Sequence, residues 1–178
     1  MSGQRDAIVA GETFTNSSIT HTNEDMETSM NFEIRPAKTT DADAIVAFNQ
    51  RIAMETEDKM LDENVLRPGV EKVLSNSSLG FYTVAVSEGK VVGCMMVTYE
   101  WSDWRNGVFW WIQSVYVDAK FRRKGVFRAI YEYIRDLGIA QDACGFRLYV
   151  ERDNAVAQQT YASMGMKETP YRIFEVEC

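Results

Sequence analysis

A chain of 178 residues, 46% hydrophobic and 25% charged, is long enough for one globular domain with a sizeable core. Its formal net charge of −7 argues against a general nucleic-acid-binding protein, which would carry a basic face. No apolar run approaches the roughly 20 residues that a membrane-spanning helix requires. We therefore expect neither nucleic acid nor a membrane as a partner.

Cysteine and histidine usage narrows the chemistry. The three cysteines, Cys94, Cys144 and Cys178, lie far apart and form no Cys-x-x-Cys pair, which is typical of reduced thiols in the cytoplasm. The start of the chain shows no signal-peptide pattern. The single histidine, His21, supports neither a zinc site nor a histidine-based triad. We expect a cytoplasmic protein without a metal site.

Hydrophobic periodicity divides the chain into an arm and a domain. Residues 1–31 are polar and aperiodic, and we interpret them as a flexible arm or as a segment ordered only by another chain. Residues 32–178 form the predicted domain. Its predicted elements are strand 32–37, helices 42–58 and 64–75, strands 80–86, 91–100 and 109–117, helix 126–137, strand 146–151, helix 154–164 and strand 167–176. This order predicts an α/β (α+β) fold with one mixed, mostly antiparallel β-sheet flanked by helices on both faces.

The segment 109–137 is the centre of this arrangement. From 109 to 117 nearly every residue is bulky and apolar, except Gln113 and Ser114, which is typical of a central strand covered on both faces. An amphipathic helix follows, and Gly138 is its expected C-terminal stop.

A basic turn joins this strand to this helix. Its residues, with the first of the helix, are Arg122, Arg123, Lys124, Gly125, Val126 and Phe127. A helix N-terminus has unpaired N–H groups and a partial positive charge, and Gly125 has no Cβ to keep a ligand away. The turn is therefore a candidate site for a di- or polyphosphate. Taken alone, such a turn is more often only a solvated surface.

Two segments together resemble the GNAT superfamily of N-acetyltransferases. The first signature of that family is Arg or Gln, two residues, Gly, one residue, and Gly or Ala. In this chain those positions hold Arg122, Gly125 and Phe127. The second signature is an Asn, a Tyr seven residues later, and a Gly that closes the helix. In this chain they are Asn154, Tyr161 and Gly165. Because Phe127 is bulkier than the usual residue, its side chain must point away from the phosphates.

The resemblance covers about residues 32–178 and implies the GNAT fold with acetyl-CoA as co-substrate. The residues that it implies bind the pantetheine arm are Val115, Tyr116, Val117 and Asn154. It also makes Tyr161 the candidate acid, since a phenol of pKa about 10 can protonate a leaving thiolate whose acid has a pKa of about 8.5. Without the paired signatures, a helix-capping Asn154 and a core Tyr161 would be the simpler interpretation.

The general base is less defined, because the family does not assign it to one motif position. The candidates are Glu55, Glu57 and Asp58 at the end of a helix and Glu100 at the end of a strand. Of these we take Glu57 and Glu100 as candidate catalytic residues beside Tyr161. The acidic run could equally be a solvated helix end. Gln113 could orient a water, and an amine that arrives neutral needs no strong base.

These observations predict an N-acetyltransferase that moves an acetyl group from acetyl-CoA directly to a primary amine of a small molecule or peptide. The alternative is a catalytically silent acyl-CoA-binding or regulatory domain on the same fold, because fold alone does not decide activity. Four tryptophans, at 101, 104, 110 and 111, cluster around one hairpin and could recognise a cationic amine, or could simply pack on the sheet. The many aromatic residues at this hairpin and in the last strand also predict a homodimer.

Overall fold

The structure, a computed structural model, describes residues 31–176. Five strands form one sheet in the order β1-β2-β3-β4-β5, in which neighbours are antiparallel except for the parallel pair β4 and β5. The strands are β1 (Glu33–Pro36), β2 (Phe81–Ser87), β3 (Lys90–Ser102), β4 (Gly107–Val117) and β5 (Gly145–Leu148). The α-helices are α1 (Ala42–Glu57), α2 (Glu63–Ser75), α3 (Val126–Ala140) and α4 (Ala155–Ser163).

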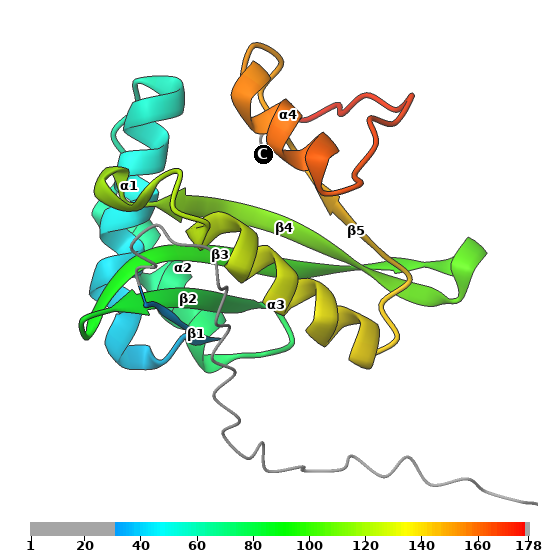
Figure 1. Cartoon of the computed structure of the whole chain (residues 1–178). Helices are drawn as coiled ribbons and strands as arrows, with labels where there is room; N and C mark the ends of the chain where they lie inside the picture. Colours follow the sequence, from blue (N-terminus) through cyan, green and yellow to red (C-terminus); the bar gives the residue numbers. More distant parts are fainter. Residues whose placement is uncertain (1–30, 177–178) are drawn as a thin grey trace, which may run out of the picture.

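Helices cover both faces of the sheet, as predicted (Figure 1). One core lies between the sheet and α3, and its buried members include Met95, Trp110, Ile112, Ile130 and Ile134. The other core lies between the sheet and the pair α1 and α2, and its buried members include Ile45, Phe48, Val70, Val84 and Tyr116. Because β4 contributes to both cores and lies between β3 and β5, the prediction of a central strand covered on both faces is confirmed.

A β-bulge interrupts β4 at the polar pair in its sequence. Between Gln113 and Tyr116 the pairing with β3 shifts, so that Ser114 and Val115 together oppose the single residue Met95. Ser114 takes a left-handed backbone conformation with φ 47°. Because a bulge of this kind moves the side-chain alternation by one residue, Tyr116 enters the core under α1 and α2 instead of the core under α3.

Gly138 has a different role from the predicted helix stop. The helix α3 continues past it to Ala140. A Cβ on Gly138 would lie 2.5 Å from Cζ of Phe146 and 3.3 Å from Cε3 of Trp110. Gly138 therefore lets the last turn of α3 approach the aromatic rings of β4 and β5.

The helix α2 is continuous across Pro68 and Gly69, as the prediction of one helix over 64–75 requires. Asp62 caps its N-terminus by accepting a hydrogen bond from the amide of Asn64 at 2.9 Å. A proline at this position removes only one helical hydrogen bond, which the rest of the helix tolerates here.

The predicted last strand, 167–176, is wrong. After α4 the chain turns at Gly165, with φ 85°, and residues 167–176 adopt no strand. Within the described residues β5 is therefore the end of the sheet, and its outer edge pairs with no other strand. Residues 1–30 and 177–178 lie outside the described part, so the predicted arm, His21 and Cys178 are not addressed by the structure.

We expect Gly138→Ala to lower the free energy of unfolding by up to about 2 kcal/mol. Overpacking against Phe146 and Trp110 costs about 1 to 3 kcal/mol, and the better helix propensity of Ala returns about 1 kcal/mol. Gly69→Ala in α2 is the matched control, because a Cβ there meets nothing within 4 Å and only the propensity gain remains. Urea unfolding measures both, and a Gly138→Ala protein as stable as Gly69→Ala contradicts the packing role.

Candidate active site

The strands β4 and β5 separate half-way along β4. Their pairing ends with Ile112 opposite Leu148. Beyond this point β4 continues to Val117 beside β3 alone, whereas the chain after β5 leads to α4 (Figure 1). One edge of residues 113–117 therefore has no strand partner within the described chain, and its N–H and C=O groups can pair with a ligand, apart from the carbonyl of Val117, which accepts a hydrogen bond from Nε of Arg122. Val115, Tyr116 and Val117, the predicted contacts of the pantetheine arm, lie on this segment.

The basic turn follows β4 and ends at the first residue of α3. Arg123 and Gly125 both have a left-handed backbone, with φ of 62° and 82°. Gly125 is the N-cap of α3, and a Cβ built on it would meet nothing within 4 Å. The space around this glycine is thus open, and the first N–H groups of α3 have no partner inside the helix. This combination of open space and positive potential suits an anionic ligand.

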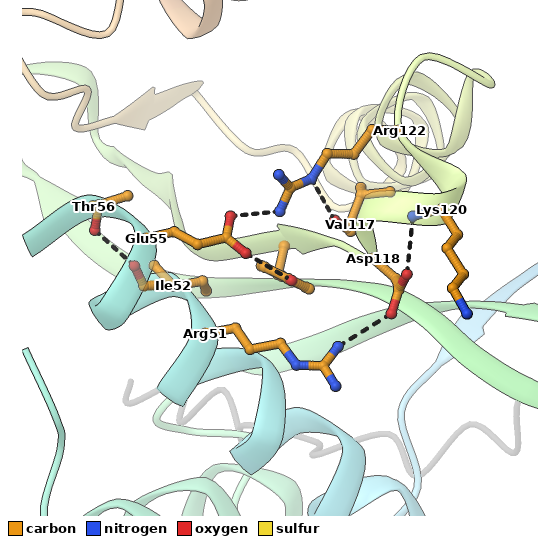
Figure 2. A network of polar contacts seen from close by, with 9 residues as sticks. Arg51, Ile52, Glu55, Thr56, Val117, Asp118, Lys120 and Arg122 are labelled. Atoms are coloured by element: carbon orange, nitrogen blue, oxygen red, sulfur yellow. Dashed lines mark hydrogen bonds and ion pairs between the residues drawn. The ribbon is translucent and has the colours of Figure 1, made fainter. Parts of the chain in front are cut away.

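Arg122 is held in place by a residue of α1 (Figure 2). Its Nη2 donates to Oε2 of Glu55 at 2.6 Å, and its Nε donates to the carbonyl of Val117 at 2.9 Å. The hydroxyl of Tyr116 donates to the other oxygen of Glu55 at 3.0 Å. The guanidinium also lies 5.3 Å from the centre of the Tyr116 ring. Glu55 thereby connects the end of α1 to the central strand and to the basic turn.

A second ion pair joins the same two elements. Arg51, one helical turn before Glu55, bonds through Nη1 to Oδ2 of Asp118 at 3.1 Å. Asp118 also accepts a hydrogen bond from the amide of Lys120 at 3.0 Å, which shapes the start of the turn. The spacing of four residues puts Arg51 and Glu55 on one face of α1, and that face meets the turn.

The electrostatics of this network favour a charged guanidinium and a neutral phenol. The hydrogen bond to Glu55 raises the pKa of Arg122. Burial, and then the neighbouring Glu55, raise the pKa of Tyr116. Because the side chains of Glu55 and Arg122 are 45% and 44% exposed, their ion pair contributes only about 0 to 1 kcal/mol. A phosphate can therefore compete with Glu55 for Arg122.

On the other side of the opening, α4 carries the second predicted group. Asn154 is its N-cap, and its side-chain oxygen accepts a hydrogen bond from the amide of Ala157 at 3.0 Å. Burial raises the pKa of Tyr161, so this phenol is protonated at neutral pH, and its hydroxyl has no hydrogen-bond partner in residues 31–176. The ring of Phe127 lies 5.8 Å from that of Tyr161 and 6.4 Å from that of Tyr131. Phe127 thus packs toward α4, which accommodates the bulky residue of the first signature.

The candidate bases are not gathered at one point. Both oxygens of Glu100 accept hydrogen bonds from Nη1 of Arg147, at 2.7 and 2.8 Å, and one also accepts from Nε1 of Trp111. These contacts use three of the roughly four acceptor positions of the carboxylate, so Glu100 keeps one position for a proton. Glu57 is exposed at the end of α1, and its side chain makes no hydrogen bond within the described chain. Of the acidic run, Glu55 alone is in contact with β4 and the turn.

The tryptophans divide between core and surface. Trp110 is buried in the core under α3, whereas Trp101 and Trp104 are 62% and 88% exposed at the hairpin. Trp111 stacks on Tyr149 with ring centroids 4.5 Å apart. The prediction that at least one tryptophan packs on the sheet is therefore confirmed for Trp110.

Sequence reasoning missed Arg147 and the pairing of Glu55 with Arg122. The guanidinium of Arg147 lies 3.8 Å above the ring of Phe109 while it bonds Glu100. No local pattern marks Arg147, because its partner is 47 positions away. The spacing of Arg51 and Glu55 on α1 was a usable signal for the other contact.

The described residues offer little to metal or thiol chemistry. Within 31–176 no group of three or more His, Cys, Asp or Glu side chains could hold a metal ion, and no helix there has the length and apolar character needed to cross a bilayer. Cys94 is fully buried, and burial raises its pKa to about 12. A thiol in this state is a core side chain and not a nucleophile.

Comparison with known proteins identifies the fold that contains these separated strands and the glycine at the helix N-terminus. The sequence profile of the acetyltransferase (GNAT) family matches residues 47–166. A possible acetyltransferase from Clostridium difficile 630 is 47% identical over 83% of this chain and 97% of its own, with a TM-score of 0.77. This chain belongs to the GNAT family of acetyltransferases.

More distant structures share the fold. Glucosamine-6-phosphate N-acetyltransferase from Arabidopsis thaliana is 21% identical over 82% of this chain and 97% of its own, with a TM-score of 0.65. AAC(6')-Iy, in complex with the bisubstrate analogue CoA-S-monomethyl-acetylneamine, is 15% identical over 83% of this chain and 98% of its own, with a TM-score of 0.67. A comparison with curated proteins gives no match.

We expect Gly125→Asp to weaken CoA binding at least about 100-fold, because juxtaposed like charges cost several kcal/mol. Gly89→Asp is the matched control. Gly89 also has a positive φ, 73°, and open space around it, but lies in the turn between β2 and β3. Isothermal titration with CoA compares the two folded variants, and equal affinities would remove the turn from the phosphate site.

Proposed function

We propose that this protein transfers an acetyl group from acetyl-CoA directly to the nitrogen of a primary amine, with both substrates bound at once. The free edge of β4, which leads to the open N-terminus of α3, carries this proposal. A strand edge can pair with the amide groups of pantetheine, and a helix N-terminus can hold the pyrophosphate. Only the basic turn separates the free edge of β4 from the N-terminus of α3 along the chain, so one extended ligand can contact the strand edge and the helix N-terminus together.

The cofactor contacts follow from this geometry. Val115, Tyr116 and Val117 offer main-chain groups to the pantetheine arm. Asn154 uses its side-chain oxygen as a helix cap, so its amide nitrogen is the group left to donate to the arm. The phosphates are bound by the residues of the turn and the first helical turn: Arg122, Arg123, Lys124, Gly125, Val126 and Phe127. Arg122 exchanges its weak ion pair with Glu55 for the phosphate, which frees one oxygen of Glu55 while the other still accepts from the hydroxyl of Tyr116.

The reaction forms a C–N bond and breaks the C–S bond of the thioester. The amine nitrogen attacks the acetyl carbonyl, and the thiolate of CoA leaves. Tyr161 donates its proton to the sulfur, for which its raised pKa keeps it in the protonated state. The proton lost by the amine passes to a carboxylate, for which Glu57 and Glu100 are the proposed bases, or to solvent when the amine binds neutral. Cys94 is too deeply buried to form an acetyl-thiol intermediate, which supports direct transfer.

The distant neighbours support the choice of an amine and of CoA. One carries the name of an N-acetyltransferase, and another is a complex with a CoA bisubstrate analogue. The exposed Trp101 and Trp104, beside Asp103, suit a cationic amine through their ring faces. A screen of amino sugars, polyamines, amino acids and peptide N-termini would identify the amine that is acetylated.

We also propose that the chain acts as a homodimer in the cytoplasm. Cys94 and Cys144 are free thiols, which supports a reducing compartment. Exposed aromatic side chains on the described surface, at the hairpin and near the end of the chain, support association with a second copy.

Incubation with acetyl-CoA, the amine panel and a thiol-reactive dye tests the activity. The expected result is amine-dependent release of CoA, with a mass gain of one acetyl group on the amine. Thermal stabilisation by CoA without turnover on any amine would favour the silent acyl-CoA-binding domain. A protein that CoA does not stabilise would contradict both.

We expect Tyr161→Phe to lower kcat by about 100- to 10,000-fold, the range for loss of a positioned general acid. CoA affinity should change little, because the ring and its contact with Phe127 remain. Tyr133→Phe is the control, since Tyr133 is a half-buried tyrosine of α3 whose pKa is also raised by burial. A wild-type kcat in Tyr161→Phe would assign the proton on sulfur to water.

A further inference from the structure

A charged and aromatic cluster lies on the sheet face that carries α1 and α2, next to the point where β4 and β5 separate. Residues 110 and 112 of β4 belong to the core under α3, so the alternate residues Phe109 and Trp111 point to the opposite face. Arg147 of β5 pairs with Trp111, one residue before the pairing of the two strands ends. Glu100 of β3 lies opposite Phe109 and completes what we call the Arg147 cluster: Glu100, Phe109, Trp111 and Arg147.

Guanidinium groups cover the aromatic ring at the centre of this cluster. Phe109 is buried, yet it belongs to neither of the two cores of the described chain. The guanidinium carbons of Arg147 and Arg105 lie 3.8 and 4.9 Å from its ring centre. Glu100 balances the charge of Arg147, whereas the guanidinium of Arg105 forms no ion pair or hydrogen bond among residues 31–176. Asp103, on the same hairpin as Arg105, accepts a hydrogen bond from the amide of its neighbour instead. The surroundings of Phe109 are therefore locally cationic in a chain whose net charge is −7.

Arg147 uses only part of its hydrogen-bonding capacity. Its Nη1 donates to both oxygens of Glu100, at 2.7 and 2.8 Å. Its Nε and Nη2 make no hydrogen bond among the described residues, and its side chain is 34% exposed. These two nitrogens form the edge of the planar guanidinium that matches the two oxygens of a carboxylate or phosphate. Because Phe109 and Glu100 already fix the plane of the guanidinium, this edge is preorganised for such an anion.

The phosphates of the cofactor lie too far away to occupy this edge of Arg147. A strand rises about 3.3 Å per residue, so the part of β4 from Trp111 to Val117 spans about 20 Å. The basic turn, which is the candidate phosphate site, begins only after Val117. The acetyl end of the cofactor, which would reach the opening between β4 and β5, carries no anion. An anion at Arg147 therefore belongs to the second substrate.

Gln113 offers a group for the amine between the Arg147 cluster and the opening. Its Nε2 donates to Oγ1 of Thr98 at 2.7 Å, and its Oε1 has no hydrogen-bond donor among the described residues. Gln113 follows Trp111 on the same face of β4, about 7 Å nearer to the unpaired half of the strand. A molecule that contacts both Gln113 and Arg147 therefore has its amine and its anion several bonds apart.

We propose that the amine substrate carries a carboxylate or phosphate, which binds Nε and Nη2 of Arg147 while the amine lies beside Gln113 at the opening. The inference rests on the proposed acetyl transfer and adds the class of acceptor, an amine with an oxyanion at its other end. A neutral amine leaves the free edge of Arg147 to water. A polyamine brings a second ammonium group toward Arg147 and Arg105, and this juxtaposition of like charges is unfavourable.

Matched amines, added to the wider panel, test the substrate class. Butylamine, 1,4-diaminobutane, 4-aminobutyrate and 3-aminopropylphosphonate are similar in length and differ in the end group, and the last two separate a carboxylate from a phosphate-like anion. Glucosamine and glucosamine 6-phosphate form a second set. We expect kcat/KM of the anionic member to exceed that of the neutral member by about 10- to 100-fold, the range for charge-assisted hydrogen bonds, and the diamine to be the poorest. A panel whose best substrate is neutral or polycationic overturns the proposal and leaves acetyl transfer intact, whereas no turnover of any amine overturns both.

Substitution of Arg147 distinguishes a substrate contact from an ion pair that only supports the fold. We expect Arg147→Gln to raise KM for the best anionic amine about 10- to 100-fold with little change in kcat, the result of losing a binding contact. The readout is the ratio of kcat/KM between the anionic amine and its neutral counterpart, because any effect that reaches the reaction through Glu100 cancels in this ratio. Arg147→Lys keeps the charge but loses the planar edge, so the ratio should fall by a smaller factor. Arg135→Gln, which removes an exposed arginine paired with Asp136 on α3, is the control and should keep the wild-type ratio. A wild-type ratio in either folded variant of Arg147 overturns the proposal.

Discussion

The separation of β4 from β5 after Ile112 is the constraint on which the rest of the structure depends. A sheet strand that loses its neighbour presents N–H and C=O groups that must find another partner or water. Gly145 allows β5 to begin close against Phe109, because a Cβ there would lie 2.5 Å from that ring. The bulge at Ser114 then bends the second half of β4. The opening between β4 and β5 is thus a consequence of the two strands themselves. The chain continues from β4 through the basic turn to α3, and from β5 to α4.

The bulge also explains why the polar network of Glu55 exists. Without the extra residue, Tyr116 would face α3, where its hydroxyl would be buried among apolar side chains. With it, the hydroxyl reaches Glu55 on α1, and Glu55 in turn reaches Arg122. The network is exposed enough to cost little when it opens, and it connects α1 with the basic turn. An anion that binds at the turn and takes Arg122 from Glu55 would therefore change the contacts at the end of α1.

Sequence patterns predicted the central part of the fold well and its ends poorly. The predicted bounds of all five strands and all four α-helices agree with the structure to within about three residues. Burial on one face of a helix or sheet leaves a direct pattern in the sequence, which is why these elements can be predicted. The sequence predicts Gly138 as a helix stop, but its role is the close contact with Phe146. That contact is tertiary, so no local sequence pattern indicates it. The strand 167–176 was predicted from its own composition, but a strand needs a neighbour, which the segment itself cannot specify.

The same limit applies to the candidate site. The two signatures point to the turn and to α4, because backbone conformation at Gly125 and the cap at Asn154 demand particular residues. The partners of Glu55, Glu100 and Arg122 are set by tertiary contacts between positions far apart in the chain, as the 67 positions between Glu55 and Arg122 illustrate. A carboxylate chosen by its place in an acidic run, such as Glu57, differs from Glu55 only in the helix face it occupies.

Among the described residues the outer edges of β1 and β5 and one edge of β4 beyond Ile112 have no strand partner, and the side chains around each edge decide what it can bind. The edge of β4 beyond Ile112 leads to a cationic turn and a helix N-terminus, where an anion gains and an apolar strand would leave Arg122 and the helix N–H groups without partners. A groove beside β5 is mixed, because the apolar side chains of Phe146, Met164 and Met166 share it with the ammonium group of Lys167. Backbone geometry alone would let either edge accept either ligand. The side chains around the edge of β4 therefore favour an anionic ligand there.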